Sequence, residues 1–284
     1  MTAANGLNHG DERAAQSALR RCAANVVAAI AVLARPASIH LHNPWSLTPR
    51  QLAIAAGLTL VIFLLVMFLI DAAAINAVRH LPRWIIWCFE QITDFGKSGW
   101  FLWPLGILFL ALAALPNLPR MPQLVLAAIM VRVGFLFAAI GATGLFDTII
   151  KRMIGRARPL VGGSLDPYLF SPFKWTAQYA SLPSGHATTA FAVLVAFGTL
   201  WPRGRTILWI YALLIAASRV VVSAHYPSDV LAGAVVGTTG ALLVRRWFAL
   251  RRLGFSVGPD GAVHQFPGPS LQRIKAVARA LLDQ

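Results

Sequence analysis

The sequence predicts an all-α membrane protein, a polytopic bundle of six transmembrane helices with an interfacial helix between the first two. Composition is the first observation behind this prediction. Hydrophobic residues make up 57% of the 284 residues, charged residues make up 12%, and the mean hydropathy is +0.66, which is more apolar than a soluble domain of this length usually is. The second observation is that the apolar residues gather into runs close to the length of about 20 helical residues that a bilayer core requires.

Six apolar runs account for the predicted spans. They cover residues 52–70, 100–115, 124–150, 187–201, 206–222 and 230–250. A tight turn, residues 202–205, separates the fourth run from the fifth. Between the first two runs, residues 79–89 mix tryptophan with charged residues and proline, a composition suited to the headgroup zone, and we expect the interfacial helix there.

The spans divide the chain into three expected parts. Residues 1–50 form an N-terminal tail, residues 51–250 form the six-span membrane domain, and residues 251–284 form a C-terminal tail. In the first tail, the apolar stretch 22–34 is short and alanine-rich, and we interpret it as an interfacial or loosely ordered helix. If this stretch crossed the membrane, the number of spans would be odd and the orientation would have to be reconsidered. In the second tail, residues 267–284 are compatible with an amphipathic helix on the cytoplasmic surface.

The distribution of basic residues predicts the orientation. An even number of spans places both termini on one side, and that side then carries fifteen of the 25 Lys and Arg residues against nine on the other. Arg132 lies inside the third span, without a partner that the sequence identifies. Because cytoplasmic loops are enriched in Lys and Arg, we expect a multi-pass inner (cytoplasmic) membrane protein with cytoplasmic termini. Anionic lipid accounts for the net charge of +15, so no nucleic-acid partner is expected.

Polar residues gather at the ends of alternate spans, on the side opposite the termini. The first cluster follows the third span, where Lys151 and Arg158 are seven residues apart and fall on nearly the same helical face. Such a pair suits two oxygens of one phosphoryl group, and Asp147 is placed to pair with Lys151. The alternative interpretation is that these are ordinary basic residues snorkelling at a membrane interface.

The second cluster, Pro183-Ser184-Gly185-His186, stands at the entrance of the fourth span. Free backbone N–H groups at a helix start favour an anion, and Ser184 adds a hydroxyl donor. Gly185 lets the backbone approach an oxygen closely, and His186 is able to carry a proton. A serine cap with a hydrogen-bonded interfacial histidine is the alternative.

The third cluster contains Arg219, at the end of the fifth span, and His225 with Asp229, four residues apart at the start of the last span. A carboxylate there accepts one imidazole N–H and leaves the other ring nitrogen free as a nucleophile. A capped helix with a structural His–Asp hydrogen bond is the alternative. All three clusters reach the same membrane face in the predicted topology, which favours one phosphate site over three coincidences.

These residues and their spacings resemble the signatures of the type 2 phosphatidic acid phosphatase family. All three signatures are complete and in order from Lys151 to Asp229. The resemblance implies that His225 attacks phosphorus to give a phosphohistidine, that Asp229 holds the His225 ring, and that His186 protonates the leaving oxygen. It implies that the phosphate oxygens are bound by Lys151, Arg158, Ser184, Gly185 and Arg219. Neither a metal nor another cofactor is required by this scheme, and Cys22 and Cys88 match no metal or redox spacing.

The resemblance implies an integral membrane lipid phosphatase that hydrolyses a phosphate monoester or pyrophosphate of an acyl or prenyl lipid. Its active site is expected to face the periplasm or the cell exterior. Phosphatidic acid, phosphatidylglycerol phosphate, undecaprenyl pyrophosphate and lipid A all remain candidate substrates. Two other functions stay open, namely a lipid-linked phosphotransferase that uses the same intermediate and a non-catalytic lipid transporter. The vanadium haloperoxidases share the motifs, but they are soluble proteins. The oligomeric state is not predicted.

Overall fold

The computed structural model describes residues 3–37 and 47–282, and it confirms the all-α prediction. The parts of the expected tails at residues 1–2, 38–46 and 283–284 lie outside the described residues. The helices before the loop that precedes α7 are α1 (Ala3–Ala34), α2 (Pro49–Leu65), the π-helical turn η1 (Val66–Ile70), α3 (Asp71–Val78), α4 (Arg83–Asp94), α5 (Gly99–Ala114) and α6 (Arg120–Ile154). After that loop, which contains the 3-10 turn Ala177–Tyr179, come α7 (Gly185–Leu200), the 3-10 turn Pro202–Gly204, α8 (Arg205–Val221), α9 (Pro227–Leu250), β1 (Phe255–Val257), β2 (Val263–Gln265) and α10 (Leu271–Leu282).

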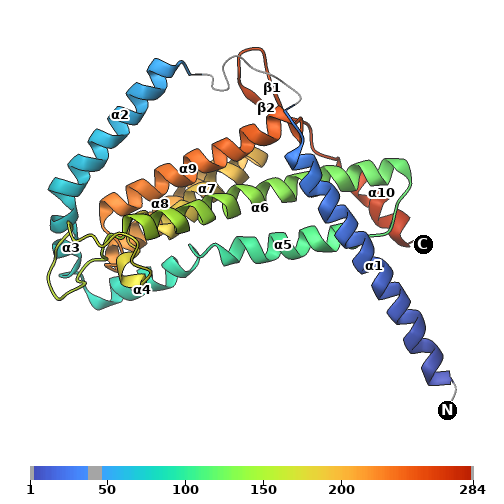
Figure 1. Cartoon of the computed structure of the whole chain (residues 1–284), viewed down its shortest axis with the longest axis horizontal. Helices are drawn as coiled ribbons and strands as arrows, with labels where there is room; N and C mark the ends of the chain where they lie inside the picture. The colour runs from blue at the N-terminus through green and yellow to red at the C-terminus, as the bar shows by residue number, and fades with distance from the viewer. Residues whose placement is uncertain (1–2, 38–46, 283–284) are drawn as a thin grey trace.

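The core of the bundle is α7, which packs against α6, α8 and α9 (Figure 1). Most α7 residues are buried, and small alanines of α6, α7 and α9 meet in one core cluster. Two glycines allow the close contact between α9 and α7. A Cβ on Gly233 would lie 2.5 Å from the carbonyl oxygen of Ser184, and a Cβ on Gly237 would lie 2.3 Å from that of Thr188. The starts of α7 and α9 are therefore held side by side.

Six helical segments are long and apolar enough to cross a membrane, which agrees with the predicted number, but the set differs by one member. Five of the segments contain the expected spans: Pro49–Val78, Arg83–Ala114, Arg120–Ile154, Pro202–Val221 and Pro227–Leu250. The sixth is Gln16–Ala34, whereas α7, expected to be a span, has only 16 residues and is about 24 Å long.

The N-terminal segment is a longer and more regular helix than the sequence suggested. We expected an interfacial or loosely ordered helix in the tail, and the structure has the regular 32-residue helix α1, as the high helix propensity of its many alanines explains. The amide of Asn25 donates to the carbonyl oxygen of Ala113 at 2.7 Å, which attaches α1 to the end of α5. With α1 and α7 both counted, the described residues contain seven apolar helices. If all seven crossed the membrane, the two termini would lie on opposite sides.

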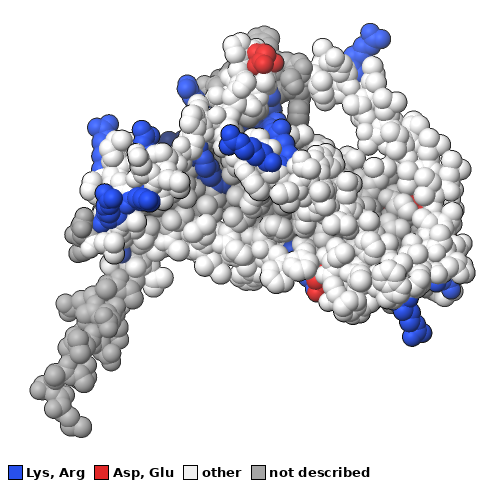
Figure 2. Space-filling model, turned by 180° about the vertical axis from the view of Figure 1, so that it is seen from behind, with Lys and Arg blue, Asp and Glu red and all other residues white. Residues whose placement is uncertain are grey.

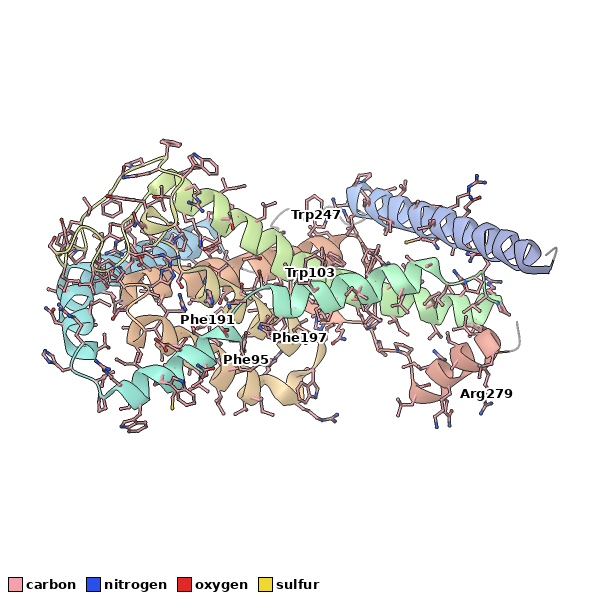
Figure 3. All side chains as sticks on the ribbon, turned by 90° about the horizontal axis from the view of Figure 1, so that it is seen from below. Phe95, Trp103, Phe191, Phe197, Trp247 and Arg279 are labelled. Carbon is pink, nitrogen blue, oxygen red and sulfur yellow. The ribbon has the colours of Figure 1, made fainter. Side chains whose placement is uncertain are left out.

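The described part of the C-terminal tail is packed against the bundle rather than free. The antiparallel strands β1 and β2 form a hairpin, and Phe255 of β1 is buried against Phe135 and Phe248. The expected amphipathic helix is α10, which buries Val277 in a cluster with residues of α6. Figure 3 shows α10, with Arg279, at the end of the molecule away from α3.

Arg132 finds its partners in this tail. Its guanidinium donates to the carbonyl oxygens of Phe266 at 2.9 Å and Pro267 at 3.1 Å, and also to Ala128 of its own helix at 2.8 Å. Helix α6 has 35 residues and is about 52 Å long, which exceeds a bilayer core of about 30 Å. The first turns of α6 therefore extend beyond the apolar layer, and the tail packs there.

The consecutive segments α2, η1 and α3 are attached to the bundle mainly through α3. Helix α2 has no buried residue and extends away from the other helices, whereas α3 returns to the bundle and buries Asp71 and Ile75 (Figures 1 and 2). The expected interfacial segment 79–89 is represented by α4, on which Trp84 and Trp87 are exposed.

Candidate active site

The candidate site lies at the end of the bundle where α6 ends and where α7 and α9 begin (Figure 1). Helix α6 ends at Gly155, whose φ of 64° is left-handed and whose Cβ would lie 1.9 Å from the carbonyl oxygen of Ser171, so this position requires glycine. The backbone N–H of Ser184 donates to the carbonyl oxygen of Asp229 at 2.9 Å. This bond joins the second predicted cluster to the third.

The Lys151 side chain lies between α6 and the start of α7. Its Nζ is 2.6 Å from Oδ2 of Asp147, which confirms the predicted pair, and Oδ1 of Asp147 accepts from the hydroxyl of Thr188 at 3.0 Å. A Cβ on Gly185 would lie 3.0 Å from the Lys151 Nζ. Glycine at this position therefore leaves the ammonium group next to the first backbone N–H groups of α7, where an anion is favoured.

The His225 ring is held by a backbone carbonyl rather than by the carboxylate we expected. Its Nδ1 is 2.8 Å from the carbonyl oxygen of Ser181 and 3.8 Å from Oδ2 of Asp229. The prediction that Asp229 accepts the imidazole N–H is therefore wrong in this detail. The reason is that Oδ2 of Asp229 already accepts from the Ser181 hydroxyl at 2.6 Å and from the Tyr226 N–H at 2.9 Å. Because a carbonyl only accepts, Nδ1 carries the proton and Nε2 keeps a free lone pair.

The surroundings of His225 favour its neutral form. The side chain is 1% exposed, and burial lowers the pKa of His225 to about 4, an effect that the nearby Asp229 carboxylate opposes and the charges of Arg219 and Arg158 increase. The imidazole is thus neutral at neutral pH, with one ring proton and one free lone pair, which is the form that a nucleophilic histidine needs.

Three donors near His225 are left without a protein partner among the described residues. They are the Nε atoms of Arg158 and Arg219 and the hydroxyl of Ser184, all buried. The rest of each arginine is held in place, because the Arg219 Nη1 donates to Thr93 at 2.5 Å and the Arg158 backbone N–H donates to Gln178 at 2.8 Å. Unpaired buried donors cost free energy, so this group is typical of a site that binds an anion.

The last predicted site residue, His186, is the second residue of α7. The charged groups around its ring are Arg219, His225, Lys151 and Lys97. The structure therefore brings all eight predicted site residues to one end of the bundle. Among the residues that the structure describes, no three His, Cys, Asp or Glu side chains form a cluster able to hold a metal ion.

A cavity of about 450 Å³ adjoins this site. Lys151 and His186 lie in its wall, and Gly141 and Gly144 of α6 together with Leu102 of α5 continue the lining along the helices. The lining combines charged and hydroxyl-bearing side chains with glycines and leucines, so the cavity offers both polar and apolar contacts. The exposed tryptophans of α4 do not line it.

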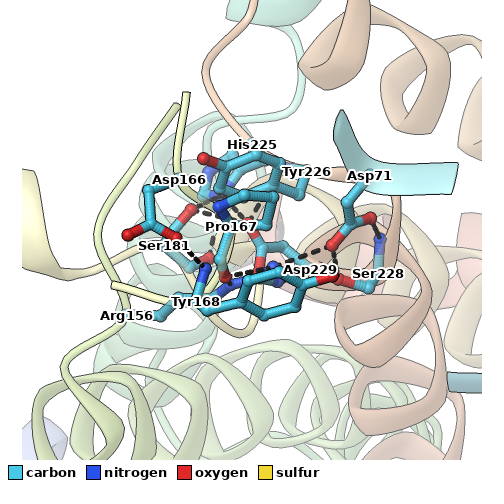
Figure 4. Close-up of polar contacts among 10 residues, drawn as sticks. All are labelled: Asp71, Arg156, Asp166, Pro167, Tyr168, Ser181, His225, Tyr226, Ser228 and Asp229. Atoms are coloured by element: carbon cyan, nitrogen blue, oxygen red, sulfur yellow. Dashed lines mark hydrogen bonds and ion pairs between the residues drawn. The ribbon is translucent and has the colours of Figure 1, made fainter. Parts of the chain in front are cut away.

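Sequence reasoning missed a buried network behind His225, which Figure 4 shows. Arg156 is 0% exposed and donates from Nη1 to Oδ1 of Asp229 at 2.6 Å and to Ser228 at 2.7 Å, and from Nη2 to Oδ2 of Asp71 at 2.7 Å. Both Nε and Nη2 also donate to the carbonyl oxygen of Pro167. No spacing pattern connects Asp71 with residues so distant in the chain, and Arg156 was visible only as one more basic residue between Lys151 and Arg158.

Comparisons with known proteins show the family to which the chain is similar. Residues 132–253 match the model of the PAP2 superfamily. The lipid A 1-phosphatase of Rhizobium johnstonii is 37% identical over 174 residues, which cover 61% of this chain and 71% of that protein. The phosphatidylglycerophosphatase B of Escherichia coli is 32% identical over 96 residues, covering 32% of this chain and 37% of that protein. Among solved structures, Aquifex aeolicus LpxE superposes with a TM-score of 0.45 at 20% identity, covering 61% of this chain and 93% of that one.

Proposed function

The chain belongs to the PAP2 superfamily and is a membrane lipid phosphatase, and from this premise we propose that it hydrolyses a phosphate monoester or pyrophosphate of an acyl or prenyl lipid through a phosphohistidine at the periplasmic face. One observation carries the mechanism. The Nδ1–H of His225 donates to the Ser181 carbonyl, which leaves Nε2 free. The buried Nε atoms of the nearby Arg158 and Arg219 have no protein partner among the described residues.

In the first step, Nε2 of His225 attacks phosphorus and the bond from phosphorus to the lipid oxygen breaks. The equatorial oxygens are bound by the cations Lys151, Arg158 and Arg219, with the hydroxyl of Ser184 and the N–H of Gly185. Phosphoryl transfer depends mainly on such positioned charge, because little covalent chemistry remains for the protein to do. Positive charge develops on the His225 ring, and the Asp229 carboxylate 3.8 Å away stabilises it.

His186 supplies the proton that the leaving oxygen needs. Burial and the neighbouring cations disfavour its protonated form in the absence of substrate, and the negative charges of a bound phosphate oppose that effect. In the second step His186 takes a proton from water, the water oxygen attacks phosphorus, and the nitrogen–phosphorus bond breaks. His225 regains its lone pair, and inorganic phosphate is released.

The lipid tail is proposed to lie in the cavity between α5 and α6. The polar end of that cavity contains Lys151 and His186, and Gly141 and Gly144 leave room beside the apolar Leu102. The exposed tryptophans of α4, Trp84 and Trp87, do not line this cavity, which supports a path along α6.

The orientation is argued from the basic residues alone. Many arginines lie in three segments: the turn between α7 and α8, the end of α9, and the C-terminal tail. These three segments lie at the end of the bundle away from the site. Figure 2 shows Lys and Arg gathered over that end. Because basic residues are retained on the cytoplasmic side, the candidate site then faces the periplasm. This argument does not depend on whether α1 crosses the membrane.

The relatives suggest which substrates to test first. One is named a lipid A 1-phosphatase and the other a phosphatidylglycerophosphatase, and the former match covers more of this chain. The first panel should therefore contain a lipid A phosphate, phosphatidylglycerol phosphate, phosphatidic acid and undecaprenyl pyrophosphate.

The test is release of inorganic phosphate by the purified full chain, comparing wild type with His225→Ala, each with and without a chelator. We expect loss of at least about 1,000-fold in the variant, because the nucleophile itself is removed. Full activity of His225→Ala would overturn the mechanism, and loss of wild-type activity with chelator would show a metal requirement. Product analysis with an added lipid acceptor separates hydrolysis from phosphoryl transfer to that acceptor.

A further inference from the structure

Behind the His225 ring lie three fully buried charged side chains, Asp71, Arg156 and Asp229, in which Arg156 forms an ion pair with each carboxylate (Figure 4). Two carboxylates share one guanidinium, so the trio carries a net charge of −1. Burying charges without water is costly unless each one is paired and hydrogen-bonded. Every member here is paired, and the trio is adjacent to His225, whose ring becomes positive when it attacks phosphorus in the proposed reaction.

We propose that Arg156 and Asp71 are positioning residues of the phosphoryl-transfer centre, in which Asp71 shares the guanidinium of Arg156 with Asp229 and so leaves a net negative charge beside His225. This inference rests on the proposed function, because it assumes that His225 is the nucleophile. It goes beyond that function because it makes Asp71, a residue of α3, responsible for the net negative charge beside His225. Asp71 lies outside residues 132–253, which match the family model.

Geometry supports a positioning role for Arg156. Its Nη1 holds Oδ1 of Asp229 at 2.6 Å, while the Ser181 hydroxyl holds Oδ2 at 2.6 Å. Both carboxylate oxygens are thereby fixed, and the same Ser181 supplies the carbonyl that binds His225 Nδ1. A planar guanidinium is needed for this, because Arg156 reaches Asp229, Asp71 and the Pro167 carbonyl from its three nitrogen atoms at once.

Geometry also supports the role of Asp71. Its Oδ1 accepts from the backbone N–H of Ser228 at 2.9 Å, at the N-terminus of α9, where the helix favours a negative charge. Its Oδ2 accepts from Arg156 at 2.7 Å and from the Ser228 hydroxyl at 2.5 Å. Asp71 follows directly after the π-helical turn η1. Single π-helical turns occur frequently at functional sites, and this one directs the Asp71 side chain into the bundle.

The charge of the trio has a measurable consequence. The charged and titratable groups that face His225 are Asp229 from α9, Arg219 from α8, Arg158 from the loop after α6, and His186 from α7. Arg156 and Asp71 act on His225 through Asp229. Removing Arg156 makes the surroundings more negative and favours a protonated His225, whereas removing Asp71 as well restores the original net charge.

The experiment compares Arg156→Gln with the double variant Asp71→Asn/Arg156→Gln. Both have lost the guanidinium that fixes Asp229, so kcat is expected to fall at least about tenfold in both with KM within about twofold. The acidic limb of kcat/KM is expected to rise by about one pH unit in Arg156→Gln and to return toward the wild-type position in the double variant. A purely structural role predicts no such reversal.

Arg246→Gln is the matched control. Arg246 is also a buried arginine, but it lies 17 residues after Asp229 on α9, about 26 Å along the helix, and donates to the Gly261 carbonyl at 3.1 Å. Its kcat and acidic limb are expected to stay at wild-type values. If Arg156→Gln does not fold, the double variant decides, because its net buried charge equals that of the wild type.

A double variant with kcat within twofold of wild type would overturn the inference, and so would an acidic limb that does not move in a folded Arg156→Gln protein. His225→Ala separates this failure from a failure of the proposed function. If His225→Ala is inactive while the Arg156 variants have wild-type activity, only the positioning role of Arg156 and Asp71 is refuted. If His225→Ala is fully active, the nucleophile itself is wrongly assigned.

Discussion

Replacing Gly144 by leucine should separate lipid substrates from water-soluble ones. A Cβ at this position meets no atom within 4 Å, so the substitution fits the fold, yet Gly144 lines the cavity proposed for the lipid tail. A leucine side chain there displaces about three methylene groups of substrate from the cavity. At about 0.8 kcal/mol for each buried methylene, the transition state for a lipid loses about 2.4 kcal/mol, or about 60-fold in kcat/KM.

The assay compares a long-chain lipid phosphate with a small soluble phosphate monoester on the same purified protein. We expect the soluble substrate to be hydrolysed within about twofold of the wild-type rate, because the phosphate-binding residues are unchanged. Gly57→Leu is the matched control, since its Cβ also meets no atom within 4 Å and it lies on the exposed helix α2. Equal losses for both substrates, or no loss for the lipid, would refute the path along α6.

Two further outcomes follow from the geometry of the site. The ring signal that His225→Asn removes from the NMR spectrum of histidine-labelled protein is expected to titrate near pH 4, because burial lowers the pKa of His225 to about 4. The unfolded chain takes up this proton near pH 6.5. The contribution of His225 to the unfolding free energy is therefore complete above that pH and decreases as the pH falls toward 4. Titration near pH 6.5 would contradict the buried position. Gly233→Ala is expected to lower the unfolding free energy by about 1–3 kcal/mol, because the new Cβ would lie 2.5 Å from the Ser184 carbonyl oxygen. Gly57→Ala should be neutral or stabilising in the same thermal unfolding assay. Equal behaviour of the two variants would show that α7 and α9 are not in such close contact.

Local chemistry and spacing predicted the parts of this protein that depend on neighbours in sequence. The apolar runs identified five of the six candidate spans, because hydropathy is a property of a window of about 20 residues. The i, i+4 spacing of Asp147 and Lys151 predicted a pair that the structure confirms. The helix entrance at Ser184 and Gly185 was visible from their composition and proved to be the start of α7.

Features that depend on tertiary packing escaped prediction. The His225 ring is bound by the carbonyl of Ser181, 44 positions earlier in the chain, and a backbone carbonyl leaves no mark in a sequence. Arg132 is bound by carbonyl oxygens about 134 positions away, for the same reason. The short helix α7 was counted as a span and α1 was not, because length and hydropathy do not show which apolar helix lies inside the bundle.

The buried charges also indicate where the catalytic unit begins. The family match starts at residue 132, but a unit that started there would leave Arg156 with one carboxylate instead of two and the Ser228 N–H at the start of α9 without its acceptor. Removing one partner of a buried ion pair destabilises by about 3–5 kcal/mol, a large share of the stability of a typical domain. Helix α3 is therefore part of the active-site structure, whereas α2, which has no buried residue, is joined to it only through η1. Asp71 thus ties α3 to the proposed catalytic centre.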